Sequence, residues 1–123
     1  MRWENYPNFS EKELACTFTG RCFMTEHFMG KLQELRDAYG KPLIITSGFR
    51  DPKHPIEEAK SRPGVHTRGL AVDIACDGQE AYKLIKLAIN LDFKGIGIKQ
   101  KASGRFIHLD TYDQEPRPNI WSY

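Results

Sequence analysis

Two short apolar segments of this chain each carry one titratable side chain near their centre, and this pattern constrains the fold more than any other feature. Residues 70–75 contain Asp73, and residues 105–109 contain His108 between two apolar neighbours. Runs of this length, rich in apolar and β-branched residues, are typical of strands. An unpaired carboxylate in an apolar strand is costly, so Asp73 requires a strong partner such as a metal ion or a buried cation.

The remaining elements follow from apolar spacing and from capping residues. Ser10 followed by Glu13 is typical of a capped helix start, and apolar residues at intervals of three or four predict a helix over 25–39 that ends at Gly40. The other predicted elements are a buried strand at 42–46, a helix at 79–91 and a strand at 95–98. This order predicts an α+β fold, a small and mainly antiparallel sheet with helices packed on one face.

Length and composition indicate one ordinary globular domain. We expect residues 1–123 to form a single domain, because domains commonly hold roughly 100 to 150 residues. The net charge of +2 is too small to indicate nucleic-acid binding. The first residues lack the apolar core of a signal peptide, and no stretch approaches the ~20 apolar residues of a membrane span. We therefore expect a monomer made in a cytoplasm, without stable membrane insertion.

The cysteines and one long loop add two further expectations. Cys16, Cys22 and Cys76 cannot all pair within one molecule, which argues against a disulfide framework. Cys16 and Cys22 could pair or lie near a metal ion, but we expect buried or half-buried thiols, because cysteine is among the most buried residue types. Residues 47–64 contain three prolines, including Pro63, and two glycines, so they predict a long loop of the kind that often carries function.

Two histidines and one carboxylate form the candidate metal site. His66 precedes Gly69, which allows a tight backbone before the strand that carries Asp73, and His108 lies on a later strand. Catalytic zinc sites favour three nitrogen or oxygen ligands and keep the fourth position for water. Taken singly, His108 could be a hydrogen-bonded core histidine and Asp73 the partner of an arginine. The combination favours a Zn²⁺ site made by His66, Asp73 and His108.

These residues resemble the motif of a known family. The pattern His66-x-x-Gly69-x-Ala71-x-Asp73, followed by His108 on a later strand, resembles the zinc D-alanyl-D-alanine carboxypeptidase and L-alanyl-D-glutamate endopeptidase family. The same metal site also occurs in hedgehog signalling domains.

The resemblance covers most of the chain, from about residue 9 to residue 121. Residues 47–50 (Ser-Gly-Phe-Arg) resemble a family segment before the long loop, and residues 117–121 resemble the tail of short phage and bacterial members. The resemblance implies Zn²⁺-dependent hydrolysis of an amide bond in peptidoglycan stem peptides. Arg50 would then hold a substrate carboxylate or stabilise the developing oxyanion, and its ordinary alternative is an ion pair at the surface. His54 in the loop is a candidate substrate contact or simply an exposed histidine.

Two positions depart from the family pattern. Gly64 stands two residues before His66, where many members have serine, and Arg105 stands three residues before His108, where many have a catalytic Glu or Asp. Asp110 is our candidate for the general base, because residues two apart on a strand share a face and Asp110 would lie beside His108. The alternative role for Asp110 is to orient a ligand histidine.

The resemblance to short members also implies a setting. We expect a phage or prophage endolysin, made in the host cytoplasm, that reaches the cell wall after membrane disruption and recognises its substrate through the catalytic groove. One alternative is a binding module that keeps the zinc site and has lost its base, as Arg105 permits. Another is a phage tail component with the same fold, which would be associated with the virion.

Overall fold

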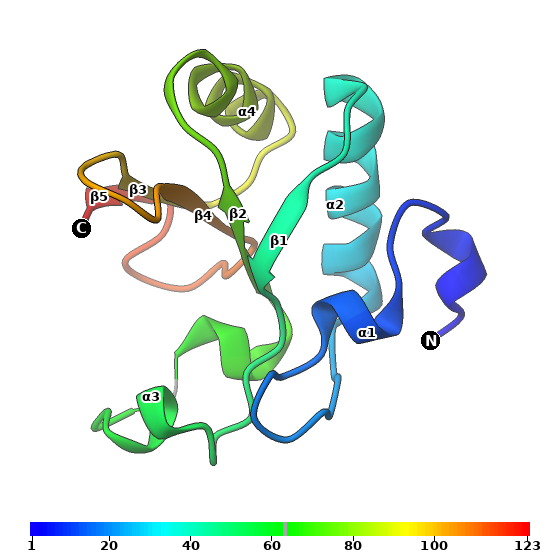
Figure 1. Ribbon diagram of the computed structural model, residues 1–123, viewed down its shortest axis with the longest axis vertical. Helices are drawn as coiled ribbons and strands as arrows, with labels where there is room; N and C mark the ends of the chain where they lie inside the picture. The colour runs from blue at the N-terminus through cyan, green and yellow to red at the C-terminus, as the bar shows by residue number, and fades with distance from the viewer. Residues whose placement is uncertain (63) are drawn as a thin grey trace.

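The computed structural model describes residues 1–62 and 64–123, which form an α+β fold (Figure 1). Pro63, counted above among the turn formers of the long loop, lies outside the described residues. In chain order the elements are the short 3₁₀ helix η1 (Trp3–Asn5), α1 (Glu11–Leu14), α2 (Glu26–Tyr39), β1 (Ile44–Ser47), α3 (Pro55–Glu58), the 3₁₀ helix η2 (Val65–Arg68), β2 (Ala71–Ala75), α4 (Gly78–Asn90), β3 (Gly95–Lys99), β4 (Phe106–Asp110) and β5 (Asn119–Ser122).

Five strands form one sheet in the order β1-β2-β4-β3-β5. The first three pairings are antiparallel and β5 runs parallel to β3, so the predicted, mainly antiparallel sheet is confirmed. The prediction of a buried strand at 42–46 is wrong in its burial, because β1 forms an edge of the sheet and Ile44 is 64% exposed. The apolar run at 42–46 could not reveal that only one side of this strand has a neighbour.

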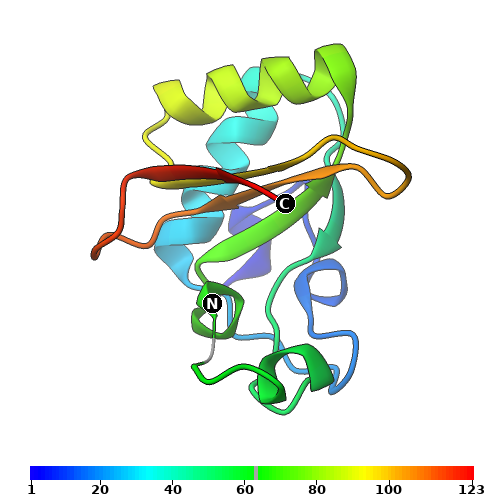
Figure 2. The same ribbon diagram turned by 90° about the vertical axis from the view of Figure 1, so that its left-hand side faces the viewer.

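Helices α2 and α4 pack side by side on one face of the sheet (Figures 1 and 2). Helix α2 begins after Thr25, whose hydroxyl accepts a hydrogen bond from the Phe28 amide at 3.2 Å, and it ends at Gly40 in the left-handed conformation (φ 76°). The predicted start of α1 is also observed, since Ser10 Oγ accepts from the Glu13 amide at 3.2 Å. Capping residues therefore located these helices correctly.

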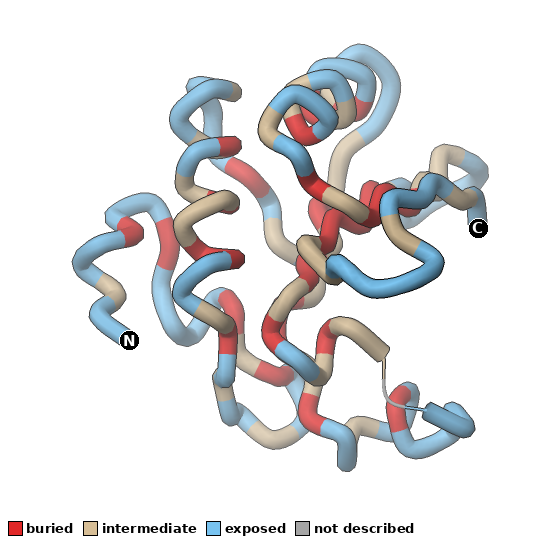
Figure 3. Tube along the Cα trace, turned by 180° about the vertical axis from the view of Figure 1, so that it is seen from behind, coloured by how far each residue is buried: buried red, intermediate tan, exposed pale blue. Residues whose placement is uncertain are grey.

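The sheet separates an apolar core from a polar face. Figure 3 shows buried positions gathered along the central strands and on the sides of α2 and α4 that face them. Alternate residues of β2, β3 and β4 point into this core, namely Val72, Ile74, Ile96, Ile107 and Leu109. The residues between them lie on the other face, where Asp73 is paired with His108 and His108 with Gly97. The candidate site is built on that second face.

The fold also bears on the expectations about membrane insertion and about the cysteines. Within the described residues, none of the helices combines the length and the apolar character that crossing a membrane requires. The three cysteines are free, with Cys16 buried and Cys22 and Cys76 partly exposed, as expected for buried or half-buried thiols.

Candidate metal centre

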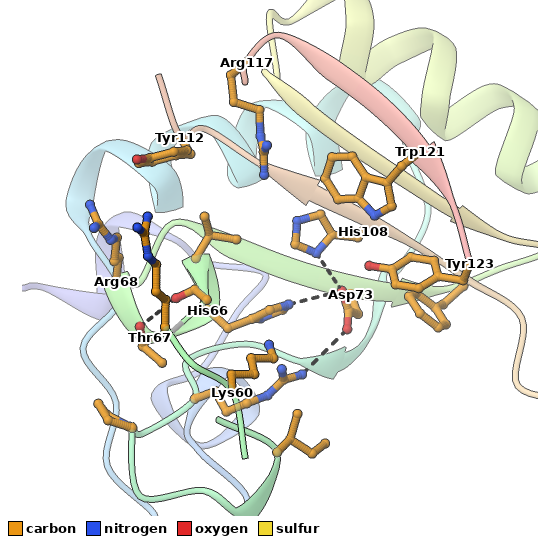
Figure 4. A pocket seen from close by; sticks show the side chains of 17 residues that line it. Lys60, His66, Thr67, Arg68, Asp73, His108, Tyr112, Arg117, Trp121 and Tyr123 are labelled. Carbon is orange, nitrogen blue, oxygen red and sulfur yellow. Dashed lines mark hydrogen bonds and ion pairs between the residues drawn. The ribbon is translucent and has the colours of Figure 1, made fainter. Parts of the chain in front are cut away.

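His66, Asp73 and His108 meet on the polar face of the sheet (Figure 4). Asp73 and His108 are paired across β2 and β4, and His66 comes from η2 just before β2. His66 Nε2 lies 3.3 Å from Asp73 Oδ1, and His108 Nδ1 lies 3.0 Å from the same oxygen. One ligand atom of each residue lies within 4.8 Å of the others, so the group could hold one metal ion.

Gly69 makes the tight path that brings His66 to the strand. It adopts φ 69°, and a Cβ at this position would collide with the carbonyl oxygen of Phe23. The Gly69 carbonyl accepts hydrogen bonds from the amide of Thr25 at 3.0 Å and from its hydroxyl at 3.1 Å. The expected tight backbone at Gly69 is therefore confirmed, and it also ties the η2 segment to the start of α2.

In His66 and His108, the ring nitrogen that does not face Asp73 has a hydrogen-bond partner. This partner determines which ring nitrogen carries the proton. His66 Nδ1 donates to the Gly48 carbonyl at 2.9 Å, since a carbonyl oxygen can only accept. His108 Nε2 lies 2.7 Å from Asp110 Oδ2 and donates to that carboxylate. In the neutral rings, the lone pairs of His66 Nε2 and His108 Nδ1 then face Asp73. Two imidazole nitrogens and one carboxylate oxygen are a donor set that Zn²⁺ favours, so these residues fit such an ion.

Burial and hydrogen bonding have opposite effects on the charges of this group. Burial would raise the pKa of the Asp73 carboxyl, but its close interactions with His108 and His66 outweigh burial and hold that pKa well below its ordinary value. Burial would lower the pKa of the His108 imidazole, but hydrogen bonds to Asp110 and Asp73 raise it. Asp73 therefore favours positive neighbours, and a metal cation and a proton compete for His108 Nδ1.

Asp110 lies behind His108, on the side of the ring away from Asp73. Its side chain is fully buried, and Arg117 binds it with two hydrogen bonds, from Nε to Oδ1 at 3.0 Å and from Nη2 to Oδ2 at 2.9 Å. Gly95 on β3 leaves the room for it, because a Cβ there would collide with the carboxylate. Asp110 thus shares the strand face of His108 as expected, but both of its oxygens are engaged. This geometry favours the histidine-orienting role over that of a base.

Arg50 connects the pocket to a buried carboxylate. Its side chain is only 13% exposed, and Nη1 donates to Glu57 Oε2 at 2.7 Å. Its Nη2 donates to Ser47 Oγ at 2.9 Å and lies 3.9 Å from Asp73 Oδ2. Glu57 Oε1 accepts from the Gly64 amide at 2.8 Å, which ties the end of the long loop to Arg50. The ion pair of Arg50 is therefore buried and lies beside the metal-binding group.

A pocket of about 940 Å³ opens over the metal-binding group. Among the described residues that line it, Asp73 is the only carboxylate, whereas the cationic side chains are Arg50, Lys60, Arg62, Arg68 and Arg117. The Arg68 guanidinium lies 5.3 Å from the centre of the Tyr112 ring, which forms part of the same wall. A pocket of this size and charge favours a ligand that carries negative groups.

Arg105 and His54 both lie outside the metal-binding group. Arg105 lines a different pocket, and its Nη2 lies 4.0 Å from the Asp77 carboxylate. Arg105 precedes the first residue of β4 and does not line the pocket over the metal-binding group. His54 caps α3, because its Nδ1 accepts from the Ile56 amide at 3.1 Å, and it is partly exposed. The loop predicted at 47–64 therefore contains one short helix.

The pocket also contains two aromatic residues from the end of the chain. Trp121 on β5 lies with its ring centre 5.2 Å from that of His108, and Tyr123 follows on the same wall. The sequence singled out Trp121 only through the family resemblance, and it gave no reason to choose Tyr123. The two-residue spacing of these aromatics is the signal that could have revealed a strand with one face at the site.

Comparison with known proteins agrees with this geometry. Residues 7–110 match the family model described as Peptidase M15, and this range holds all three candidate metal ligands. A search of the curated proteins found no match. Because the family match covers well over half of the chain, the resemblance drawn from the sequence is confirmed. The chain belongs to the peptidase M15 family, the metallopeptidases similar to zinc D-alanyl-D-alanine carboxypeptidase.

Proposed function

We propose that this protein is a zinc-dependent peptidase that hydrolyses an amide bond in the peptide stems of bacterial peptidoglycan. The observation that carries the proposal is the convergence of His66 Nε2, Asp73 Oδ1 and His108 Nδ1 at one end of an open pocket, in a chain of the M15 family. A Zn²⁺ ion held by these atoms would activate a water molecule and polarise the scissile carbonyl.

The pocket walls support a substrate with free carboxylates. Arg50 keeps N–H groups for a ligand beyond those used by Glu57 and Ser47, and a guanidinium binds a carboxylate through two parallel hydrogen bonds. Because its partners already hold the side chain, little reorganisation accompanies binding. Peptidoglycan stems contain acidic residues and a free terminal carboxylate, which the cationic walls would attract.

For Asp110 we propose the orienting role. Its carboxylate is buried, does not line the pocket and is bound by both His108 and Arg117, so it is poorly placed to take a proton from a water molecule in the pocket. It instead keeps the Nε2 proton of His108 in place and leaves Nδ1 for the metal.

One observation favours a second candidate function. Asp73 is the only carboxylate among the described pocket residues, and Arg105 holds the sequence position where many relatives have their catalytic acid. A binding module that holds zinc without turnover would have such a site. A zinc peptidase and a binding module therefore differ in turnover and not in metal content.

The test is digestion of purified peptidoglycan by the zinc-loaded protein, followed by mass spectrometry of the soluble fragments. We expect peptide fragments from the native protein and none from His108→Ala. The masses identify the bond, whether D-Ala-D-Ala, L-Ala-D-Glu or a cross-bridge. Full zinc occupancy without any fragment would contradict the peptidase and support the binding module.

The biological setting is a further proposal. The resemblance of residues 117–121 to the tail of short phage and bacterial members supports a phage or prophage endolysin that acts after membrane disruption. Mass spectrometry of purified virions tests this. An endolysin should be absent from the particle, whereas a tail component would be found in it.

A further inference from the structure

The end of the chain is fixed beside the metal-binding group. Strand β5 pairs with β3 so that Trp121 is opposite Gly97, and the Tyr123 amide donates to the Ile98 carbonyl at 3.1 Å. Residues two apart on a strand share a face, so Trp121 and Tyr123 lie on the face that carries His108.

A glycine provides the space for both rings. A Cβ at Gly97 would lie 2.7 Å from Trp121 Nε1 and 2.9 Å from a ring carbon of Tyr123. His108 is paired with Gly97 on β4, so the two rings cover the sheet directly beside this ligand histidine. The Tyr123 ring also packs on Phe106, with ring centres 5.1 Å apart. Backbone and ring contacts together therefore hold Tyr123 beside the site, with 59% of the residue exposed to solvent.

The Tyr123 hydroxyl points toward Asp73 and His108 (Figure 4). The other neutral hydroxyls of the pocket are placed differently. Thr67 Oγ1 donates to the Gly64 carbonyl at 2.6 Å, and the Tyr112 ring lies against Arg68. Tyr123 is thus a neutral hydrogen-bond donor directed at the metal-binding group.

We propose that Tyr123 is a catalytic residue that donates a hydrogen bond to the carbonyl oxygen of the scissile amide as negative charge develops on that oxygen. This inference rests on the proposed peptidase function and adds a residue to it. A phenol ordinarily has a pKa of about 10, so it keeps its proton at neutral pH and acts as a donor. A donor that is already in position stabilises the transition state without reorganisation.

The test compares Tyr123→Phe with the native protein, both loaded with zinc, on purified peptidoglycan. Phenylalanine keeps the ring contact with Phe106 and removes only the hydroxyl. We expect kcat to fall by about 10²-fold, with KM and zinc content unchanged, because loss of one oxyanion donor has about this effect. Tyr82→Phe is the matched control, since Tyr82 lies on α4 and is 69% exposed, and it should match the native protein.

This experiment distinguishes failure of the role given to Tyr123 from failure of the proposed peptidase function. Native kcat in Tyr123→Phe would overturn the assignment, as would a higher KM at unchanged kcat or a loss of zinc that accounts for the lost activity. If the zinc-loaded native protein itself releases no fragment, the peptidase proposal fails and the role of Tyr123 fails with it.

Discussion

Each ligand histidine depends on one neighbour for the position of its proton. For His66 that neighbour is the Gly48 backbone carbonyl, which a side-chain substitution cannot remove. For His108 it is the Asp110 carboxylate, which Arg117 holds from the other side. The orientation of His108 is therefore the one that mutagenesis can test.

Asp110→Asn should weaken zinc binding by about 10- to 100-fold, the usual effect of losing a partner that orients a ligand histidine. The neutral amide accepts less strongly from His108 Nε2 and leaves the buried Arg117 charge unpaired. Zinc titration, with activity measured at saturating zinc, checks this. A loss of about 10² to 10⁴ in rate at unchanged zinc affinity would instead identify Asp110 as the general base.

Glu57 should stabilise the fold in a pH-dependent way. Burial would raise its pKa, but hydrogen bonds from Arg50, the Gly64 amide and Lys60 lower it to about 2. A carboxyl with a depressed pKa contributes stability above its ordinary pKa of 4.5, and the contribution is lost as the pH falls from about 4.5 to about 2. Glu57→Gln should therefore reduce the free energy of unfolding at pH 7 by about 3 to 5 kcal/mol, because it leaves Arg50 without its buried partner.

Denaturant unfolding at several pH values measures this difference. The gap between Glu57→Gln and the native protein should shrink as the pH drops below 4.5. The neighbouring Glu58 is exposed, so Glu58→Gln is the matched control and should change stability by less than about 0.5 kcal/mol. A gap that stays constant down to pH 2 would contradict the role given to Glu57.

Among the elements, strand β3 makes room for the site because two of its residues, Gly95 and Gly97, have no side chain. Its apolar residues Ile96 and Ile98 pack toward the helices, while Gly95 and Gly97 leave room on the other face. Gly95 accommodates the Asp110 carboxylate, and Gly97 accommodates the rings that follow from β5. The polar face of the sheet can hold a buried ion pair and two aromatic rings because Gly95 and Gly97 have no side chains there.

Gly97→Ala should displace the end of the chain from the site. The new methyl group would lie 2.7 Å from Trp121 Nε1, so β5 must shift, and both stability and peptidase activity should fall. Gly30→Ala on α2 is the control, because a Cβ there meets nothing within 4 Å and alanine favours a helix by about 0.5 to 1 kcal/mol. Thermal unfolding and peptidoglycan digestion check both variants. Native activity and stability in Gly97→Ala would contradict the close packing of Trp121 and Tyr123 against Gly97.

The elements that the sequence predicted correctly are those with local signals. Helices α1 and α2 have capping residues within their own segments, and strands β2, β3 and β4 are apolar runs between turn formers. Strand β5 has only the two-residue spacing of Trp121 and Tyr123 as a local signal, because its four residues follow prolines at 116 and 118 and gain their structure from pairing with β3. The edge position of β1 likewise depends on which strands neighbour it, and no local pattern contains that information.

In the candidate site, too, the sequence predicted some residue roles and not others. His66, Asp73 and His108 could be proposed because ligand residue types occur at family spacing, and the structure brings them together. Glu57 could not be identified as the buried partner of Arg50, because a carboxylate in a loop ordinarily faces solvent. The partners of Glu57 lie only three to seven residues away, but the folded path of the loop brings them together, and no regular spacing in the sequence predicts that path.

For the whole molecule, the metal-binding group joins η2, β2 and β4, so a bound ion should stabilise the entire fold. We expect zinc at a hundredfold excess over its Kd to add about 2.7 kcal/mol to the free energy of unfolding. Protons compete with the ion for His108, and the raised pKa of His108 means that the zinc effect should weaken as the pH falls toward and below that pKa. Thermal unfolding with zinc and with a chelator, from pH 8 to pH 5, measures it. An effect that grows at low pH, or that persists in His108→Ala, would contradict this account.

The most direct test of the account is anomalous X-ray scattering at the zinc absorption edge, from crystals of the native protein grown with zinc. We predict one strong peak per chain, about 2.0 to 2.2 Å from His66 Nε2, a carboxylate oxygen of Asp73 and His108 Nδ1. The peak should be absent from crystals of His108→Ala. Zinc bound elsewhere, with these three side chains hydrogen-bonded only to one another, would contradict the metal centre on which the proposed function rests.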